Sequence, residues 1–150
     1  MNRSALFLTA IGVLAVMTFT TTPQPRGIRN NNPGNIRATG DQWQGMTGAD
    51  AAGFVQFAAP VYGVRAMARI LTSYARQGHV TVRQIITRWA PPTENDTDSY
   101  VTHAADALGL SADAPVTERH WPDLIAVMIQ HENGQQPYAE ALIREGVQIA

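Results

Sequence analysis

The chain contains no cysteine, which excludes a disulfide framework, a thiol nucleophile and any cysteine-ligated metal site. It also lacks a basic run: its eleven Lys and Arg residues are spread along 150 residues, and the formal net charge is −1. Nucleic acid is therefore not expected as a partner. Charged residues make up 15% of the chain and hydrophobic residues 45%, which argues against wholesale disorder and suffices for one domain with a sizeable core.

One uncharged stretch lies at the N-terminus. Residues 4–22, "SALFLTAIGVLAVMTFTTT", follow Arg3 and are just long enough to cross a bilayer as a helix. No small-x-small cleavage site follows, which favours a retained signal anchor over the alternative of a cleaved signal peptide. We therefore expect residues 1–22 to be a transmembrane signal anchor in the inner membrane. Residues 23–26 would be a linker, and residues 27–150 a domain in the periplasm.

The remainder of the chain alternates helical patterns with turn-forming segments. Residues 27–57 are rich in Gly, Asn and Asp, which predicts turns with short strands, and the two prolines of residues 91–98 predict a loop. Helices are expected over 60–78, 81–90, from about 99, from 122, and over 137–146. The expected fold class is mainly α, or α+β, with a small β and turn region.

A carboxylate at the end of the most apolar of these helices is the main candidate for chemistry. In "IAVMIQHENGQQPY", residues 125–138, Glu132 closes an apolar run just before Gly134. Burial disfavours a charged carboxylate, and so does the negative end of a helix dipole, so both would raise the pKa of Glu132. Such a carboxyl group stays protonated near neutral pH and can act as a general acid. The alternative is an exposed helix end with Gly134 as its cap.

Other candidates are less distinctive. Glu94, Asp96 and Asp98 lie in the predicted loop and could activate water as a general base, or could serve only in local turn hydrogen bonds. The four histidines show no metal-ligand spacing with a carboxylate, so neither a metal site nor a cofactor is expected.

Several short motifs, taken in order, resemble known enzymes. "NNNPGNIR", then Trp43 and Gly45, then "GFVQF" at residues 53–57 are similar to flagellar-type glucosaminidases and to the Gly-Leu-Met-Gln element of lytic transglycosylases. "WAPPTENDTDSYV", residues 89–101, resembles a further stretch of the transglycosylases. A group of phage virion and endolysin proteins likewise opens with "GIRNNNPGNIR" and closes with "HENGQQPY". The resemblance to lysozyme-like peptidoglycan enzymes covers residues 26–138.

This resemblance implies a lysozyme-like fold with one departure in chain order. In the family, the catalytic Glu ends a helix that precedes the Asn/Gly-rich region, whereas here no Glu or Asp precedes Asp41. The similar helix is instead the one that carries Glu132 near the C-terminus. We expect a circular permutation, which packing tolerates where the new termini lie at the surface.

The resemblance also implies a function. The chain would be a monomeric phage endolysin that cleaves the β-1,4 glycan strand of peptidoglycan for host lysis, as a muramidase or as a lytic transglycosylase. Glu132 would be the acid, with assistance from Glu94 or Asp98. The weakly apolar anchor resembles the signal-arrest-release segments of such enzymes.

Five residues are expected to bind the glycan, through hydrogen bonds or ring stacking: Asn32, Asn35, Gln56, Tyr100 and Tyr138. Trp89 follows a helical core pattern and is expected to pack rather than to bind sugar. Two alternatives stay open. The chain could be a non-catalytic virion or cell-wall-binding module on the same fold, or a membrane-anchored interaction protein.

Overall fold

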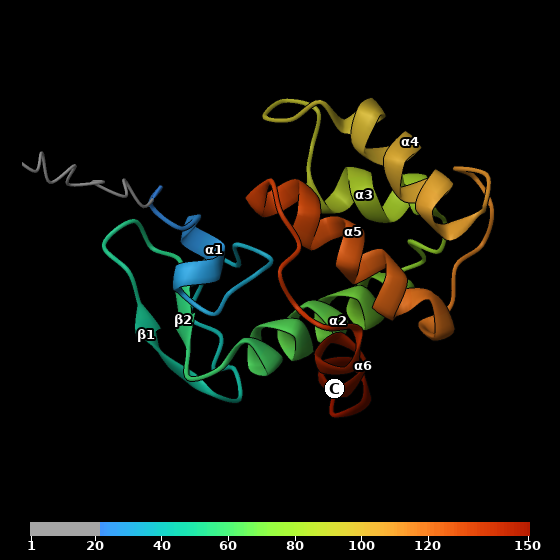
Figure 1. The fold of residues 1–150 in the computed structure, drawn as a ribbon. Coiled ribbons are helices and arrows are strands. Elements are labelled where there is room, and N and C mark those ends of the chain that lie inside the picture. The colour runs from blue at the N-terminus through green and yellow to red at the C-terminus, as the bar shows by residue number, and fades with distance from the viewer. Residues whose placement is uncertain (1–21) are drawn as a thin grey trace, which may run out of the picture.

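Residues 22–150 are described by a computed structural model, and they fold into helices with a small antiparallel sheet (Figure 1). The elements, in chain order, are α1 (Arg26–Arg29), β1 (Met46–Ala49), β2 (Val55–Phe57), α2 (Pro60–Arg76), α3 (Val82–Trp89), α4 (Thr97–Leu108), the 3₁₀ turn η1 (Glu118–His120), α5 (Trp121–Asn133) and α6 (Glu140–Gln148). The predicted α+β class with a small β region is confirmed. The short helix α1 stands where turns were expected.

The helix boundaries follow from local chemistry. Pro60 begins α2, where its missing N–H costs no hydrogen bond. Thr81 and Gln84 form a capping box at the start of α3. Asp96 accepts a hydrogen bond from the backbone N–H of Ser99 and so caps α4.

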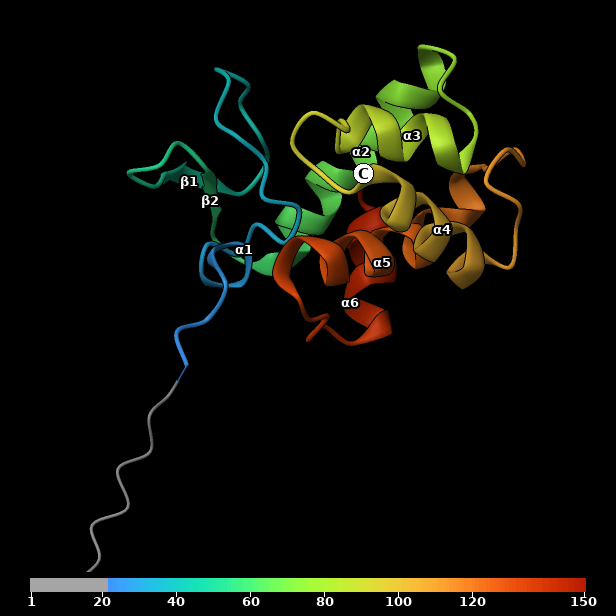
Figure 2. The same cartoon turned by 90° about the horizontal axis from the view of Figure 1, so that it is seen from above.

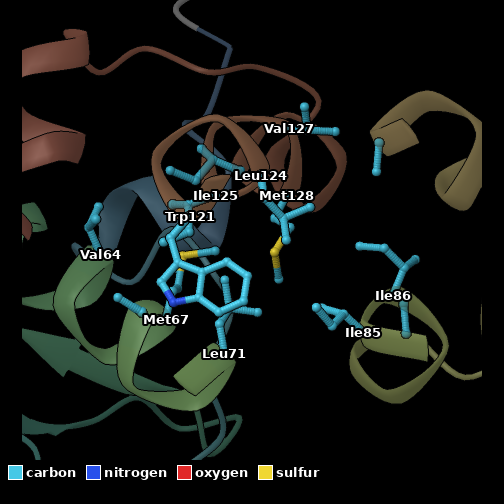
Figure 3. Packing of buried hydrophobic residues seen from close by; sticks show 14 of the residues in the cluster. Val64, Met67, Leu71, Ile85, Ile86, Trp121, Leu124, Ile125, Val127 and Met128 are labelled. Atoms are coloured by element: carbon cyan, nitrogen blue, oxygen red, sulfur yellow. The ribbon is translucent and has the colours of Figure 1, made fainter. Parts of the chain in front are cut away.

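Helix α5 lies at the centre of the helical part and packs against α4, α6 and α2. The buried core consists of apolar side chains that α5 shares with its neighbours (Figure 3), among them Met67, Leu71, Ile85, Ile86, Trp121, Leu124, Ile125, Met128 and Ile129. Because the middle of α5 is apolar on most of its faces, its charged side chains lie near its two ends.

The N-terminal part forms a separate side of the molecule. Strands β1 and β2 pair antiparallel, with Met46 opposite Phe57 and Ala49 opposite Val55. Figures 1 and 2 both show this hairpin and α1 on one side, and α3 and α4 on the other. Helix α5 contacts both sides, through α1 and α4, and α2 contacts β2, so any cleft between the two sides is lined by residues far apart in the sequence.

The predicted inner-membrane location needs correction. Among residues 22–150, no helix combines the length and the apolar character needed to cross a bilayer. The expected anchor therefore has no support, and with it the periplasmic placement of the domain. The segment assigned to it, residues 4–22, lies outside the described residues except for Thr22.

Candidate active site

Glu132 lies in the last turn of α5 and is half-buried. Gly134 ends the helix with φ of +67°, a left-handed conformation that glycine adopts without a steric penalty. Earlier in the same helix, residues 127–129 are buried in the core. The sequence prediction of a carboxylate at the end of a buried apolar helix is confirmed.

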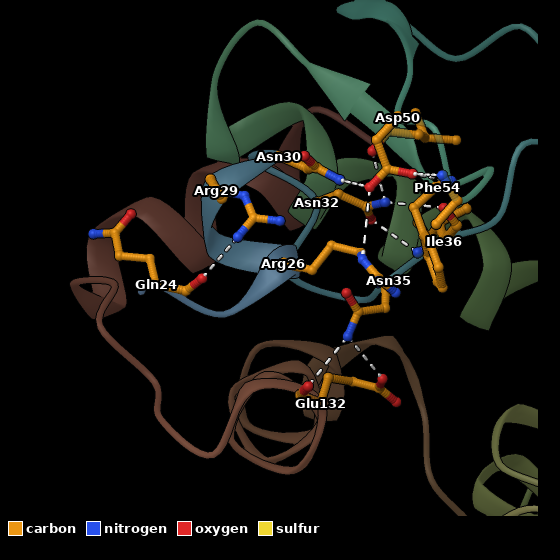
Figure 4. Close-up of polar contacts among 12 residues, drawn as sticks. Gln24, Arg26, Arg29, Asn30, Asn32, Asn35, Ile36, Asp50, Phe54 and Glu132 are labelled. Atoms are coloured by element: carbon orange, nitrogen blue, oxygen red, sulfur yellow. Dashed lines mark hydrogen bonds and ion pairs between the residues drawn. The ribbon is translucent and has the colours of Figure 1, made fainter. Parts of the chain in front are cut away.

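Two side chains from distant segments hold the Glu132 carboxylate. The indole N–H of Trp89, the last residue of α3, donates to Oε1 of Glu132 at 2.8 Å. The amide of Asn35 donates to Oε2 at 3.3 Å and to the backbone carbonyl of Glu132 at 3.1 Å, as Figure 4 shows. Each carboxylate oxygen therefore has its own donor, which fixes the orientation of the group.

Asn35 is presented by a tightly bonded loop. Its backbone is left-handed, with φ of +48°, which asparagine tolerates better than most residues. Asn32 is fully buried beneath it: its amide N–H donates to the carbonyls of Ile36 and Val55, and its Oδ1 accepts from the N–H of Ile36, all at 2.9 Å (Figure 4). Asn32 therefore shapes the loop. It was predicted to bind the glycan, but its polar atoms are used by backbone groups and do not face a ligand.

The same loop packs directly on the end of α5. The amide of Asn133 donates to the carbonyl of Pro33 at 2.8 Å. Gly27 of α1 lies directly against Asn133 and the loop. A Cβ at this position would clash with Oδ1 of Asn133 and lie 2.8 Å from the carbonyl oxygen of Asn32. This close approach brings a segment roughly a hundred residues upstream against the residue next to Glu132.

The environment of Glu132 favours its neutral form. Burial raises the pKa of Glu132, and the hydrogen bonds from Trp89 and Asn35 oppose this rise only in part. Its place in the last helical turn, at the negative end of the α5 dipole, acts in the same direction as burial. A carboxyl group that has a raised pKa and sits between two fixed donors is suited to proton donation.

A cleft of about 1020 Å³ opens in front of Glu132. One wall comes from the segment 34–43 and Phe54, and the other from the α2 segment 69–74 and the α3-to-loop segment 88–95. The lining is aromatic and polar, with Trp43, Phe54, Tyr74 and Trp89 among its members. Ring faces beside hydrogen-bonding groups suit a ligand with both apolar and polar faces.

The structure separates the two carboxylates predicted to assist. Glu94 is exposed on the loop after α3 and lines the same cleft as Glu132. Asp98 is exposed in the first turn of α4 and lines a different surface hollow, together with His103 and Asp106. Asp98 therefore does not share the cleft with Glu132, because the helix begins at Thr97 and turns its side chain away.

Three of the predicted sugar-binding residues also lie elsewhere. Tyr100 is buried in α4, where burial and the Glu132 charge raise its pKa, so it packs behind the site instead of facing a sugar. Gln56 on β2 and Tyr138 after α5 are half-buried outside the residues that line the cleft. Within residues 22–150 the buried hydroxyl of Tyr138 has no hydrogen-bond partner. Of the five predicted residues, Asn35 alone lines the cleft.

His131 points to the side away from the cleft. Its ring stacks on Tyr100 with centroids 3.9 Å apart, and its Nε2 lies 2.6 Å from Nδ1 of His103. Burial, and then the neighbouring His103, lower the pKa of His131. Within residues 22–150, no group of three or more His, Cys, Asp or Glu side chains is placed to hold a metal ion.

Trp89 is the functional residue that sequence reasoning missed. It was predicted to pack rather than to bind sugar, and its half-buried ring does pack against the core, but its indole N–H also reaches Glu132. Its position at the end of α3, two residues before the first proline of the loop, was the available signal, because a residue at a helix end is freer to face outward.

No family model matches the chain. Protein P5 of Pseudoalteromonas phage PM2 is 39% identical to it over 153 residues, an alignment that covers 97% of this chain and 96% of the phage protein. An identity of this size over nearly the full length of both chains establishes common descent. The chain therefore belongs to the same family as Protein P5 of phage PM2.

Proposed function

We propose that the chain is a lysozyme-like enzyme that cleaves the β-1,4 glycan strand of peptidoglycan, with Glu132 as its general acid. The observation that carries the proposal is the setting of the Glu132 carboxyl group. It lies at the end of a buried helix and has a raised pKa. Hydrogen bonds from Trp89 and Asn35 fix it in the wall of a large cleft. Glycoside cleavage needs a protonated carboxyl group at the scissile oxygen.

The arrangement of the elements supports the lysozyme-like fold. A small hairpin region and a larger helical part flank one cleft, and the acid lies at the end of a central helix. The Asn-rich loop docks on that helix end through Asn35 and Asn133, as expected if the acid-bearing helix has moved from the start of the domain to its end. The permutation keeps the packing and changes only the chain order.

In the proposed reaction, Glu132 donates its proton to the glycosidic oxygen while the bond from that oxygen to the anomeric carbon breaks. The carboxylate left behind accepts hydrogen bonds from Trp89 and Asn35. The positively charged sugar is then captured by one of two nucleophiles. Water that gives a proton to Glu94 attacks the anomeric carbon and leaves a hydrolysed end. Alternatively, the 6-hydroxyl of the same sugar, with help from the acetamido group, attacks that carbon, returns its proton to the Glu132 carboxylate and leaves a 1,6-anhydro end.

The test is the release of soluble glycan from purified peptidoglycan sacculi. The full chain should clear the suspension, Glu132→Gln should not, and Asp98→Asn should act like the wild type. Glu94→Gln separates the two routes, since it should abolish hydrolysis but leave anhydro formation intact. Sacculi that stay intact with the wild type, yet retain the protein after washing, would overturn the enzyme and leave a cell-wall-binding module.

A further inference from the structure

The cleft contains arginines that no acidic side chain among residues 22–150 pairs with, although Asp41 and Glu94 also line it. Four arginines line it, on both walls. Arg26 forms an ion pair with Asp50 at 3.6 Å, and Arg69 donates to the carbonyl of Ala150 at 3.5 Å. Arg37 and Arg88 have neither an ion pair nor a side-chain hydrogen bond within residues 22–150, although both are exposed in the cleft.

Aromatic rings hold these two guanidinium groups in place. Cζ of Arg37 lies 4.5 Å from the centre of the Phe54 ring, and Cζ of Arg88 lies 5.8 Å from the centre of the Tyr74 ring. A guanidinium group held against a ring face keeps its edge N–H groups free for a planar, two-point bond to a carboxylate. Both arginines are therefore preorganised for an anion.

Their positions flank the proposed acid. Arg37 follows Asn35 by two residues, and Arg88 directly precedes Trp89, so each donor to Glu132 has an arginine beside it on its own wall. Burial and the two hydrogen bonds account for the pKa of Glu132, which stays raised. Neither guanidinium group is among the causes of that shift.

We infer that Arg37 and Arg88 make the cleft selective for a glycan that carries carboxylate groups, which they bind on either side of Glu132. This inference rests on the proposed function and names its substrate class more narrowly. In peptidoglycan such carboxylates come from the lactyl ether of muramic acid, once the peptide is removed, or from the peptide stem. A neutral N-acetylglucosamine oligomer offers neither.

The experiment measures binding with the full chain carrying Glu132→Gln, so that no ligand is consumed. Three ligands are compared by calorimetry: a neutral N-acetylglucosamine hexamer, peptidoglycan strands stripped of their peptides by an amidase, and soluble uncross-linked strands with their stems intact. We expect at least one of the acidic ligands to bind about tenfold or more tightly than the neutral hexamer.

Arginine variants in the same background identify the cause. Arg37→Gln and Arg88→Gln should each weaken acidic binding about fivefold or more, and the double variant should remove the preference for acidic ligands while leaving the hexamer affinity unchanged. Arg76→Gln, an exposed arginine at the end of α2 outside the cleft, is the matched control and should change nothing. Thermal unfolding checks that each variant is folded.

The outcomes separate this inference from the proposed function. Tight binding of the stripped strands assigns the lactyl carboxylate, and tight binding of the intact strands alone assigns the stem; both support the inference. Equal affinity for neutral and acidic ligands overturns it, as does an acidic preference that survives the double variant. Failure of the wild type to cleave sacculi would overturn the enzyme, whatever the binding result.

Discussion

Replacing Trp89 with Phe removes the indole donor to Glu132 and keeps most of the aromatic surface. The lost hydrogen bond is 2.8 Å long and half-buried, and it strengthens as Glu132 gives up its proton. A hydrogen bond to a charged group contributes about 1.5–3 kcal/mol. If all of it is realised in the transition state, kcat falls by about 10- to 100-fold.

The same change should move the pH dependence. The Trp89 hydrogen bond lowers the pKa of Glu132, so its loss raises that pKa further, and the alkaline limb of the activity profile should shift to higher pH. The assay is the initial rate of glycan release across a pH series. Trp43→Phe is the matched control, because Trp43 lines the cleft without a hydrogen bond to Glu132, so its alkaline limb should stay in place. An unchanged limb and rate for a folded Trp89→Phe would show that the indole N–H does not act on Glu132.

The remaining predictions concern stability. Glu132→Gln should remove a pH dependence of stability: the raised pKa means that ionising Glu132 disfavours the folded state as pH rises from the unfolded-state pKa through the folded one. Thermal unfolding should show the wild type losing stability relative to the variant as pH rises from about 4 towards 7, and a difference that stays constant with pH would contradict this. Asp50→Asn should make the free energy of unfolding fall less steeply as the pH is lowered. The backbone N–H of Phe54, then the Asn30 amide, hold the pKa of Asp50 below its usual range, so the ionised carboxylate stabilises the fold above the unfolded-state pKa, and this stabilisation is lost as pH falls through the folded-state pKa. An unchanged dependence on acid pH in urea titrations would count against it. Gly27→Ala should lower the free energy of unfolding in urea by about 1–3 kcal/mol, because the alanine methyl group has no space beside Asn133. An unchanged free energy of unfolding would show that Gly27 and Asn133 are not in close contact.

The sequence predicted the elements better than it predicted which side chains meet. Helical periodicity and caps such as Thr81 and Pro60 are local, so the helices over residues 60–76 and 82–89 followed from them. Glu132 was identifiable for the same reason, since a carboxylate that closes an apolar helix is a local signal. Its partners were harder to identify, because Asn35 lies 97 residues away and is brought close only by packing.

Residue type alone gave misleading assignments where a polar group was used internally. Asn32 and Tyr100 have side chains typical of sugar binding, yet Asn32 bonds three backbone groups and Tyr100 is buried in α4. Asp98 looked equivalent to Glu94 within one acidic loop. The start of α4 at Thr97 separates them, leaving only Glu94 on the cleft.

The most direct test of the account is a mass analysis of the fragments that the full chain releases from purified peptidoglycan, beside those released by Glu132→Gln. We expect muropeptides cut at the β-1,4 bond, with hydrolysed or 1,6-anhydro sugar ends, from the wild type alone. Identical fragments from both proteins would contradict the role of Glu132, and uncut glycan strands from both would contradict the enzyme itself.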